Sequence, residues 1–463
     1  MNVQTLKSRI EGKVTTASDA GYEDLRRSLI WNQLTPMRYP QVVVQVASEQ
    51  DVIEAVRFAR TQNMTIAVRG GGHSWVGFPL CNGSLLIDLG RLKRISIDHQ
   101  IRTAVVQPAV TGQALNQQLA PHGLAFPVGH CQSVPLSGYL LNGGLGWNWN
   151  AWGPACFSVE AANVVLADGS LVVANQEQHA DLLWSIRGAG PAFFGVVTQY
   201  LLRLYPMPCA ITTSTYFYPL ERMEEVGAWA AGIAGQLPRE VELAIFCAQA
   251  PPAFDEHCRS SNGFICILSA TGFFDTHDEA VGTLSLLETC PIISECLGKD
   301  VNQPATMESL LDIGGRFWPE HHRCLADTLW SHSPPEQQLA AVRNAFLQAP
   351  SSKSLALCAF TTGVGGRAAA RPDAAFSMTA KTLLLCYAIW EQPEDDDVNA
   401  DWHRKTIAEL NRFAVGHYVG ESDIVQDPRR AERSFAPANW QRLQALRRTY
   451  DPDGLFHRHD RGS

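Results

Sequence analysis

Two glycine-rich segments carry the residues best suited to chemistry in this chain. RGGGHSWVG spans residues 69–77 and holds His73, and GHCQSVPLSGYLLNGGLGW spans residues 129–147 and holds Cys131. Glycine lacks a Cβ atom and accepts positive φ, so the backbone N–H groups of such loops can crowd against a pyrophosphate. Imidazole and thiol side chains are nucleophiles. The loops therefore predict a phosphate-containing ligand with a histidine and a cysteine aimed at it.

These segments are similar to those of a known enzyme family. They resemble the flavin-linked oxidases of the vanillyl-alcohol oxidase superfamily, in the berberine-bridge-enzyme-like branch that includes 6-hydroxynicotine oxidase and the sugar oxidases. RGAGPAFFGVVT at residues 187–198 resembles a third motif of the branch, with one extra residue between Pro191 and Gly195. LQALRRTYDPDGLF at residues 443–456 resembles its closing motif. The resemblance covers nearly all of residues 40–206 and the closing motif, and it is faint between them.

The resemblance implies an FAD cofactor held by two covalent bonds. In that branch a histidine of the first loop is attached to the flavin 8α-methyl carbon, and a cysteine of the second loop is attached to C6. The matching residues here are His73 and Cys131. Two covalent bonds would hold a partly exposed flavin in place, and they would favour hydride uptake by raising its reduction potential. The other residues expected at the cofactor are Arg69, Gly70, Gly71, Gly72, Ser74, Gly77, Gly129, Val134, Gly138, Gly143, Gly144, Gly146, Gly153 and Val197.

The position of Val134 bears on the electron acceptor. It lies three residues after Cys131, where the oxidases of the resembling branch tend to carry a small side chain that leaves room for oxygen. A bulkier residue there accompanies dehydrogenase behaviour. The resemblance therefore implies dioxygen as the acceptor, although Pro135 replaces the glycine usual at the next position.

Glu421 and Tyr418 are the candidates for the catalytic base. The resembling enzymes often carry Y-x-N-Y-x-D late in the substrate domain, and here the segment reads YVGESD from Tyr418 to Asp423, with Glu421 at the second tyrosine position. A glutamate in an apolar pocket can act as a base near neutral pH, because burial raises its pKa. The alternatives are a solvated loop carboxylate for Glu421 and ordinary packing for Tyr418.

Two further groups of residues have competing interpretations. Trp147, Trp149 and Trp152 follow the second glycine loop, and they could form aromatic walls for a flat substrate or pack in the core. His321 and His322 superficially suggest a metal site. Adjacent side chains on regular structure point apart, so no metal is expected there.

Composition narrows the class of protein. The chain has 463 residues, of which 46% are hydrophobic and 18% charged, and its net charge is −9. These values indicate a globular protein with several domains, and they disfavour nucleic-acid or anionic-membrane binding. The N-terminus lacks an apolar signal segment, and the twelve cysteines form no CxxC pairs. The sequence therefore predicts a cytoplasmic protein, a monomer or homodimer, without a disulfide framework.

Hydrophobic periodicity predicts the elements that position the loops. A capping box and an apolar stripe indicate a helix over residues 49–62, followed by a strand at 65–68 that ends at the first loop. Asp168-Gly169 predicts a type I′ hairpin turn within residues 163–174. Further strands are expected at 85–89, 103–110, 195–206, 355–360 and 382–390, and a helix within 334–348.

The predicted fold class is α+β. No G-x-G-x-x-G follows a strand, which disfavours a doubly wound dinucleotide fold. The resemblance implies a PCMH-type FAD-binding domain of two α/β subdomains, joined to a substrate domain with an antiparallel sheet covered by helices. Pro206 and Pro208 indicate the first domain boundary, near residue 206. The expected domains are residues 1–206 for the first part of the FAD-binding domain, 207–424 for the substrate domain, and 425–463 for a return to the FAD-binding domain.

The leading functional prediction is an FAD-dependent oxidase with doubly attached flavin. A base removes a proton from an O–H or N–H of a small organic molecule, a hydride passes to the flavin, and oxygen is reduced to hydrogen peroxide. The resemblance leaves alcohols, sugar lactols, amines and alkaloid-like secondary metabolites open as substrates. The alternatives are a dehydrogenase or oxidative cyclase with another acceptor, and a non-catalytic protein that keeps the flavin fold.

Overall fold

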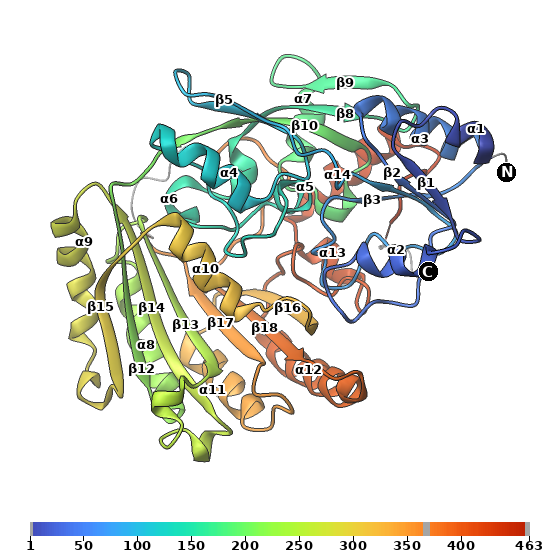
Figure 1. The fold of residues 1–463 in the computed structure, drawn as a ribbon. Helices are drawn as coiled ribbons and strands as arrows, with labels where there is room; N and C mark the ends of the chain where they lie inside the picture. The colour runs from blue at the N-terminus through green and yellow to red at the C-terminus, as the bar shows by residue number, and fades with distance from the viewer. Residues whose placement is uncertain (1–2, 364–370, 459–463) are drawn as a thin grey trace.

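Three β-sheets organise the computed structural model, which describes residues 3–363 and 371–458. Two smaller sheets come from the first half of the chain, and a large sheet from the second half lies below them at the left in Figure 1. The α+β class predicted from the sequence is confirmed by these sheets and their helices. No helix among the described residues has the length and apolar character needed to cross a bilayer.

The first sheet has four strands in the order β1-β2-β4-β3. β1 pairs with β2 in antiparallel fashion, whereas β2 and β3 both run parallel to β4. The predicted helix over 49–62 is α3, whose residues Val52, Val56 and Ala59 are fully buried. The Ser48 side chain caps it by accepting the N–H of Asp51. The strands are β1 (Lys13–Thr16), β2 (Val42–Gln45), β3 (Ile66–Arg69) and β4 (Leu85–Asp88), and the helices nearby are α1 (Val3–Lys7), α2 (Tyr22–Ser28) and α3 (Glu49–Thr61).

The second sheet has five strands in the order β5-β6-β10-β8-β9. The predicted type I′ turn is wrong, because Asp168 has no positive φ and only Gly169 does, at 78°. The Gly169 N–H donates to Leu166 O, and Leu166 N–H donates to Ser170 O, so the hairpin has a three-residue loop. The strand expected at 103–110 ends at Val106. The strands are β5 (Ile95–Asp98), β6 (Thr103–Val106), β8 (Val159–Val165), β9 (Leu171–Ala174) and β10 (Val196–Arg203), and the helices here are α4 (Gly112–Leu119), α5 (Leu136–Leu141), α6 (Trp149–Trp152) and α7 (Ala180–Ile186).

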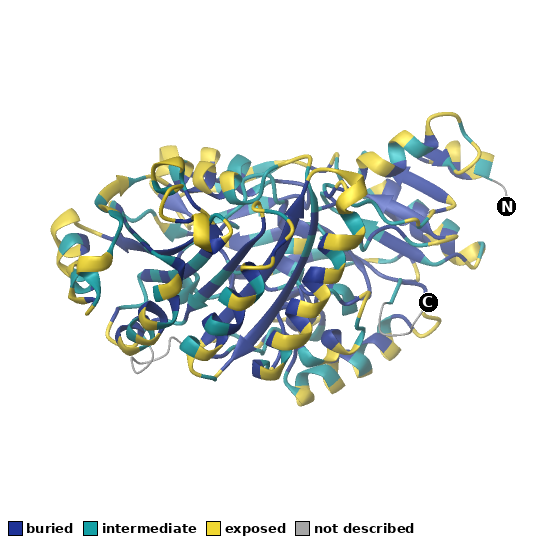
Figure 2. Cartoon of the chain, turned by 90° about the horizontal axis from the view of Figure 1, so that it is seen from below, coloured by how far each residue is buried: buried dark blue, intermediate teal, exposed yellow. Residues whose placement is uncertain are grey.

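The third sheet has seven antiparallel strands in the order β15-β12-β14-β13-β17-β18-β16. Helices α8, α9, α11 and α12 bury one of its faces in a single apolar core. Seen from below, the outer sides of helices are exposed while the strands are largely buried (Figure 2). The strands are β12 (Ala210–Tyr218), β13 (Val241–Gln249), β14 (Phe264–Phe274), β15 (Gly298–Ala305), β16 (Arg323–Ser331), β17 (Leu355–Phe360) and β18 (Thr382–Trp390), and the helices are α8 (Met223–Ala234), α9 (His277–Leu284), α10 (Met307–Phe317), α11 (Pro335–Phe346) and α12 (Asp396–Leu410).

The C-terminal segment packs on the first half of the chain. It contains α13 (Arg429–Arg433) and α14 (Pro437–Tyr450). Leu443 of α14 lies in the same apolar core as Tyr200 of β10, and Phe456 forms a parallel bridge with Ile66 of β3. β11 (Tyr205–Pro206) pairs with β7 (Leu124–Ala125) just before the chain enters the large sheet. The division at residues 206 and 424 stays a prediction.

Candidate active site

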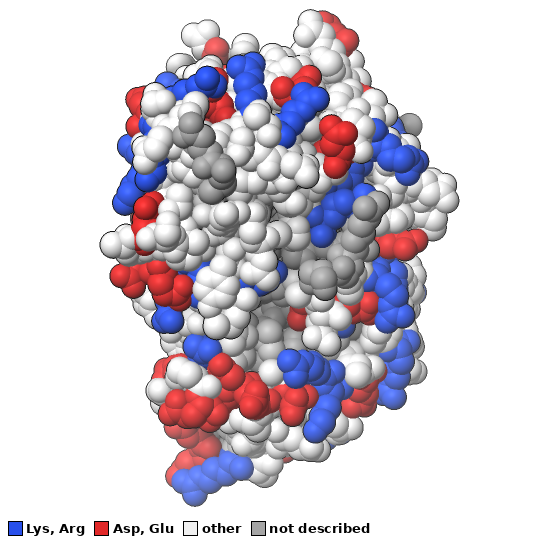
Figure 3. All heavy atoms as spheres, turned by 90° about the vertical axis from the view of Figure 1, so that its right-hand side faces the viewer, with Lys and Arg blue, Asp and Glu red and all other residues white. Residues whose placement is uncertain are grey.

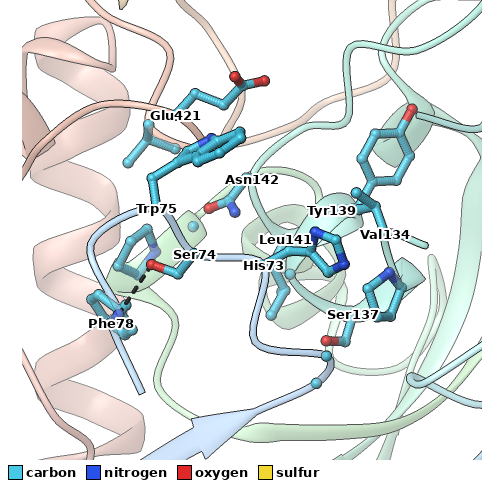
Figure 4. Close-up of a pocket in the computed structure, with 18 of the residues that line it drawn as sticks. His73, Ser74, Trp75, Phe78, Val134, Ser137, Tyr139, Leu141, Asn142 and Glu421 are labelled. Atoms are coloured by element: carbon cyan, nitrogen blue, oxygen red, sulfur yellow. Dashed lines mark hydrogen bonds between the residues drawn. The ribbon is translucent and has the colours of Figure 1, made fainter. Parts of the chain in front are cut away.

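A cavity of about 340 Å³ lies where the two glycine loops meet the large sheet. Its walls come from the first half of the chain, from β17 and β18, and from the segment around residue 420. Figure 4 shows lining side chains of both glycine-rich segments near Glu421 of the segment around residue 420. Twelve of the residues expected to hold the cofactor or to act as the base line it: Gly70, Gly71, Gly72, His73, Ser74, Gly129, Cys131, Val134, Gly138, Val197, Tyr418 and Glu421.

The first loop requires glycine because it packs tightly against its neighbours. A Cβ atom on Gly70 would lie 1.7 Å from the Ser137 hydroxyl oxygen, and one on Gly71 would lie 2.0 Å from Cγ of Pro135. Ser137 and Pro135 belong to the second glycine-rich segment. Glycines in one loop therefore allow both loops to approach each other at the cavity wall.

Arg69 stabilises the first loop through side-chain contacts and does not line the cavity. Its guanidinium forms an ion pair with Asp88 at 2.9 Å and donates to the carbonyls of Leu29 and Gly71 at 3.0 and 3.1 Å. Ser74 fixes the far end of the loop, because its hydroxyl accepts the N–H of Phe78 at 3.0 Å. These bonds fix the backbone on both sides of His73.

His73 is neutral at physiological pH. Burial, with a further contribution from the positive charge of Arg69, lowers its pKa to about 4. Its ring stacks on Trp31, with 5.2 Å between ring centroids. A backbone hydrogen bond links it to Ser133 and opposes the pKa shift. A neutral imidazole retains the lone pair that a nucleophile needs.

Cys131 lies on the second loop and also contacts Ser133. Its sulfur is 3.6 Å from the Ser133 hydroxyl oxygen. Burial raises the pKa of the Cys131 thiol, and the Ser133 hydroxyl opposes that shift. The loop therefore brings the histidine and the cysteine to a shared residue, Ser133, at one cavity.

Glu421 lies in the cavity rather than in a solvated loop. Burial raises the pKa of its carboxyl group, and a hydrogen bond from the Tyr387 hydroxyl opposes the rise. His130 and the indole N–H of Trp75 also lower that pKa. In Figure 4 the Glu421 side chain lies beside the Trp75 indole. A buried carboxylate of this kind can accept a proton near neutral pH.

The segment that carries Tyr418 and Glu421 is tied to β16. The Thr328 hydroxyl accepts the N–H of Tyr418 at 3.0 Å and lies 2.8 Å from the Ser422 hydroxyl. Asp327 forms a buried ion pair with Arg430. Tyr418 is 5% exposed, and its phenol oxygen receives backbone N–H groups from Gly144 and Leu145. These contacts hold the segment with both candidate bases against β16. Burial raises the pKa of Tyr418 above its usual value.

Comparison with known proteins identifies an FAD binding domain in this chain. Residues 40–175 match the model of the FAD binding domain. The FAD-linked oxidoreductase ptmO of Penicillium ochrochloron is 27% identical over 87% of this chain and 86% of its own length. The FAD-linked oxidoreductase nodO of Hypoxylon pulicicidum is also 27% identical, over 95% and 94%. The chain is therefore an FAD-linked oxidoreductase with an FAD binding domain.

Solved structures share the fold of this oxidoreductase. The 6-hydroxy-D-nicotine oxidase of Arthrobacter nicotinovorans superposes with a TM-score of 0.82 at 20% identity, over 98% of both chains. BBE-like 1 of Physcomitrella patens gives a TM-score of 0.83 at 19% identity, over 99% of this chain and 98% of its own. The predicted pairing of an FAD-binding domain with a large antiparallel sheet is therefore confirmed.

Six residues expected at the cofactor lie outside the cavity lining in the oxidoreductase. Gly146, for example, packs where a Cβ atom would lie 2.2 Å from the carbonyl oxygen of Val128. Gly143 packs against the Phe376 ring, and Gly144 against Tyr139 and Ala155. These glycines shape the turn around the second loop, and their contact with FAD stays a prediction. The full set is Arg69, Gly77, Gly143, Gly144, Gly146 and Gly153.

Of the three tryptophans that follow the second glycine loop, one lines the cavity and two pack against other aromatic rings. Trp149 lines the cavity. Trp147 packs on His130, with ring centroids 4.3 Å apart, and Trp152 stacks on Tyr205 at 4.8 Å. The described residues contain no cluster of three or more potential metal ligands, and His322 pairs with Glu391 instead.

Several aromatic or polar cavity residues went unrecognised in the sequence, among them Trp75, His130, Trp318 and Tyr387. Trp75 and His130 lie inside the two glycine-rich segments, so their proximity to His73 and Cys131 was a usable signal. Tyr387 lies on β18, where every residue is buried and no alternation marks the cavity side. Trp318 follows α10 with no motif around it.

Charge on the surface agrees with a small-molecule enzyme. Basic and acidic side chains are interspersed on the face shown in Figure 3. The net charge of −9 gives little long-range attraction for a polyanion. The absence of a nucleic-acid partner nevertheless stays a prediction.

Proposed function

We propose that this oxidoreductase is an oxidase whose FAD is attached to both His73 and Cys131. The observation that carries this proposal is their convergence: the two residues line one cavity and contact the same residue, Ser133. Forming each bond removes one hydrogen from the flavin and one from the side chain. The two hydrogens and their electrons reduce dioxygen to hydrogen peroxide, so both attachments balance with oxygen as the oxidant.

The described residues fit FAD in both shape and chemistry. Backbone from Gly70 to Gly72 and from the second loop lines the cavity, where N–H groups can meet a pyrophosphate. Gly190 and Gly195 of the third motif line it too, which supports a role for that motif despite its extra residue. Bound FAD would supply a two-electron acceptor for a hydride and pass those electrons to dioxygen.

Glu421 is the proposed catalytic base, and Tyr418 is the second candidate. Glu421 accepts the proton of a substrate O–H or N–H while the adjacent C–H leaves as hydride. Tyr387 orients the carboxylate by donating its hydroxyl hydrogen to it. Val134 lines the cavity, where its small side chain would leave room for oxygen beside bound FAD. The net reaction converts CH–OH or CH–NH to C=O or C=N and dioxygen to hydrogen peroxide.

Mass spectrometry of the denatured, purified protein tests the attachments. We expect the mass to increase by one FAD, and tryptic mapping to find flavin on the peptides with His73 and Cys131. H73A and C131A should each keep one bond, and the double variant should release FAD on acid precipitation. Release of flavin from the wild-type protein would overturn both bonds.

Stopped-flow reoxidation separates an oxidase from the alternative functions. Flavin reduced by dithionite should be reoxidised rapidly by air, whereas slow reoxidation would favour a dehydrogenase. A protein that binds FAD but is reduced by no substrate would be a non-catalytic flavin protein. The cytoplasmic location and the monomer or homodimer state remain part of the proposal, to be checked by fractionation and light scattering.

A further inference from the structure

One face of β17 and β18 forms the cavity wall opposite the glycine loops. Cross-strand partners on this face are Leu357 with Leu385 and Ala359 with Leu383, and all four line the cavity. Successive residues of a strand point to opposite faces, so the alternate residues Cys358 and Leu384 instead belong to the helix-covered core. The cavity side of these strands is therefore a continuous aliphatic surface.

Aromatic rings extend this aliphatic surface toward Glu421. Tyr387 lies two residues beyond Leu385 on the same face of β18. Its ring is 5.5 Å from Trp75 and 5.6 Å from Trp318, measured between ring centroids, and both contacts are edge-to-face. The wall thus becomes aromatic next to the proposed base, where a flat ring can lie against it.

Charge is nearly absent from this part of the cavity. Among the described residues that line it, no lysine or arginine occurs and Glu421 is the sole carboxylate. The Tyr387 hydroxyl already donates to Glu421. A carbohydrate needs many hydrogen-bond partners when it loses water, and a carboxylate needs a cation, so this wall would leave either unsatisfied.

We propose that the substrate is an uncharged or cationic, largely apolar molecule with fused rings, bound against the wall that the aliphatic face of β17 and β18 forms together with the Trp75, Trp318 and Tyr387 rings. This inference rests on the proposed function, because Glu421 must take a proton from the substrate. It selects among the substrate classes left open above, and it excludes sugar lactols and carboxylates. A cationic amine is compatible, since Glu421 is the sole carboxylate among the described residues that line the cavity.

Four probes test the proposal on the flavin-loaded protein. Fluorenol, the corresponding fluorene amine and a fluorene carboxylate share one ring system and differ in their functional group, and D-glucose is the carbohydrate. Binding is measured as a perturbation of flavin absorbance, and turnover as anaerobic bleaching of the flavin. We expect fluorenol or the amine to perturb the spectrum at concentrations at least tenfold below the carboxylate and D-glucose. Preferential binding or bleaching with glucose or the carboxylate would overturn the substrate class, and so would failure of both apolar probes to bind.

A charge placed on the wall gives an independent test. Leu357 is half-buried, so Leu357→Lys adds a cation at the cavity without filling the helix-covered core. We expect this variant to weaken fluorenol binding by about tenfold and to narrow or reverse its preference over the carboxylate. Leu357→Met is the matched control and should keep the wild-type order. An unchanged order in the lysine variant would overturn the role of this wall.

Failure of this inference can be distinguished from failure of the proposed function. Attachment of FAD and reoxidation of dithionite-reduced flavin require no substrate. If these succeed while the apolar probes fail, the oxidase proposal stands and the substrate class is wrong. If attachment fails while the apolar probes still bind preferentially to the FAD-loaded protein, the doubly attached flavin is wrong and the substrate class stands.

Discussion

Gly314 of α10 lies directly against the backbone carbonyl of His130. A Cβ atom on Gly314 would be 2.0 Å from that carbonyl oxygen and 3.0 Å from its carbon. The N-terminal part of α10 is held by Met307 and Leu310, which lie in a core shared with β10. The helix ends at Phe317, and the next residue, Trp318, lies on the cavity wall. One close contact therefore connects the substrate wall to the peptide that precedes Cys131.

Substitution of Gly314 should disturb the cavity from a distance. Gly314→Ala forces α10 away from His130, so we expect a loss of about 1–3 kcal/mol in the free energy of unfolding. Binding of apolar probes and the flavin fraction attached to Cys131 should both fall. Gly315→Ala is the matched control, because a Cβ there meets open space, and it should be neutral or slightly stabilising. Equal effects of the two variants in denaturation and peptide mapping would contradict this coupling.

The hydrogen bond from Tyr387 to Glu421 should set the pH dependence of flavin reduction. This bond lowers the raised pKa of Glu421, so Tyr387→Phe should raise that pKa further. A charge-assisted bond of roughly 1.5–3 kcal/mol corresponds to a shift of about one unit or more. The acid limb of the rate of flavin reduction should move to higher pH by that amount. Tyr205→Phe serves as the control, because that hydroxyl bonds Ser158 away from the cavity. An unmoved limb in Tyr387→Phe would remove Glu421 as the titrating base.

A substitution at Ser137 should rescue the effect of a substitution at Gly70, because the two residues are in contact. Gly70→Ala places a Cβ on the Ser137 hydroxyl, and we expect it to separate the two loops and reduce FAD loading. Ser137→Gly removes the obstructing atoms, at a cost of about 1 kcal/mol as a helical glycine. The double variant should therefore load FAD better than Gly70→Ala alone. Absorbance of the purified proteins measures loading, and an additive loss in the double variant would argue against this packing.

Local patterns predicted much of the fold because short-range chemistry decides those elements. Ser48 and the apolar stripe of α3 indicated that helix, and glycine runs marked both loops. The hairpin turn was mispredicted, because Asp168-Gly169 also suits a three-residue loop in which only the glycine has positive φ. Dipeptide identity alone does not fix the loop length.

The substrate wall could not be predicted for a different reason. β18 is buried on both faces, so its sequence shows no period that separates Tyr387 and Leu385 from Leu384. The side that faces the cavity depends on strands far apart in the chain, which pair in the order β13-β17-β18-β16. Glu421 was singled out because its segment resembles a motif of the berberine-bridge-enzyme-like branch, and its place in the cavity depends on the same long-range packing.

Asp327 should make the protein less stable as the pH rises through neutrality. Burial raises its pKa from 3.8 to about 7, against the opposing effect of Arg430. The folded state therefore holds this proton more tightly than the unfolded chain, so its stabilising effect is complete below about pH 4 and is lost by about pH 7. Urea unfolding at several pH values should show this loss, on the order of a few kcal/mol, and Asp327→Asn should abolish that part of the slope. Asp168→Asn is the control, because the pKa of Asp168 is lowered and its effect lies below about pH 4. If Asp327→Asn keeps the wild-type dependence of the unfolding free energy on pH, another group causes that dependence. Titration of Asp327 would then play no part in holding the Glu421 segment to the large sheet.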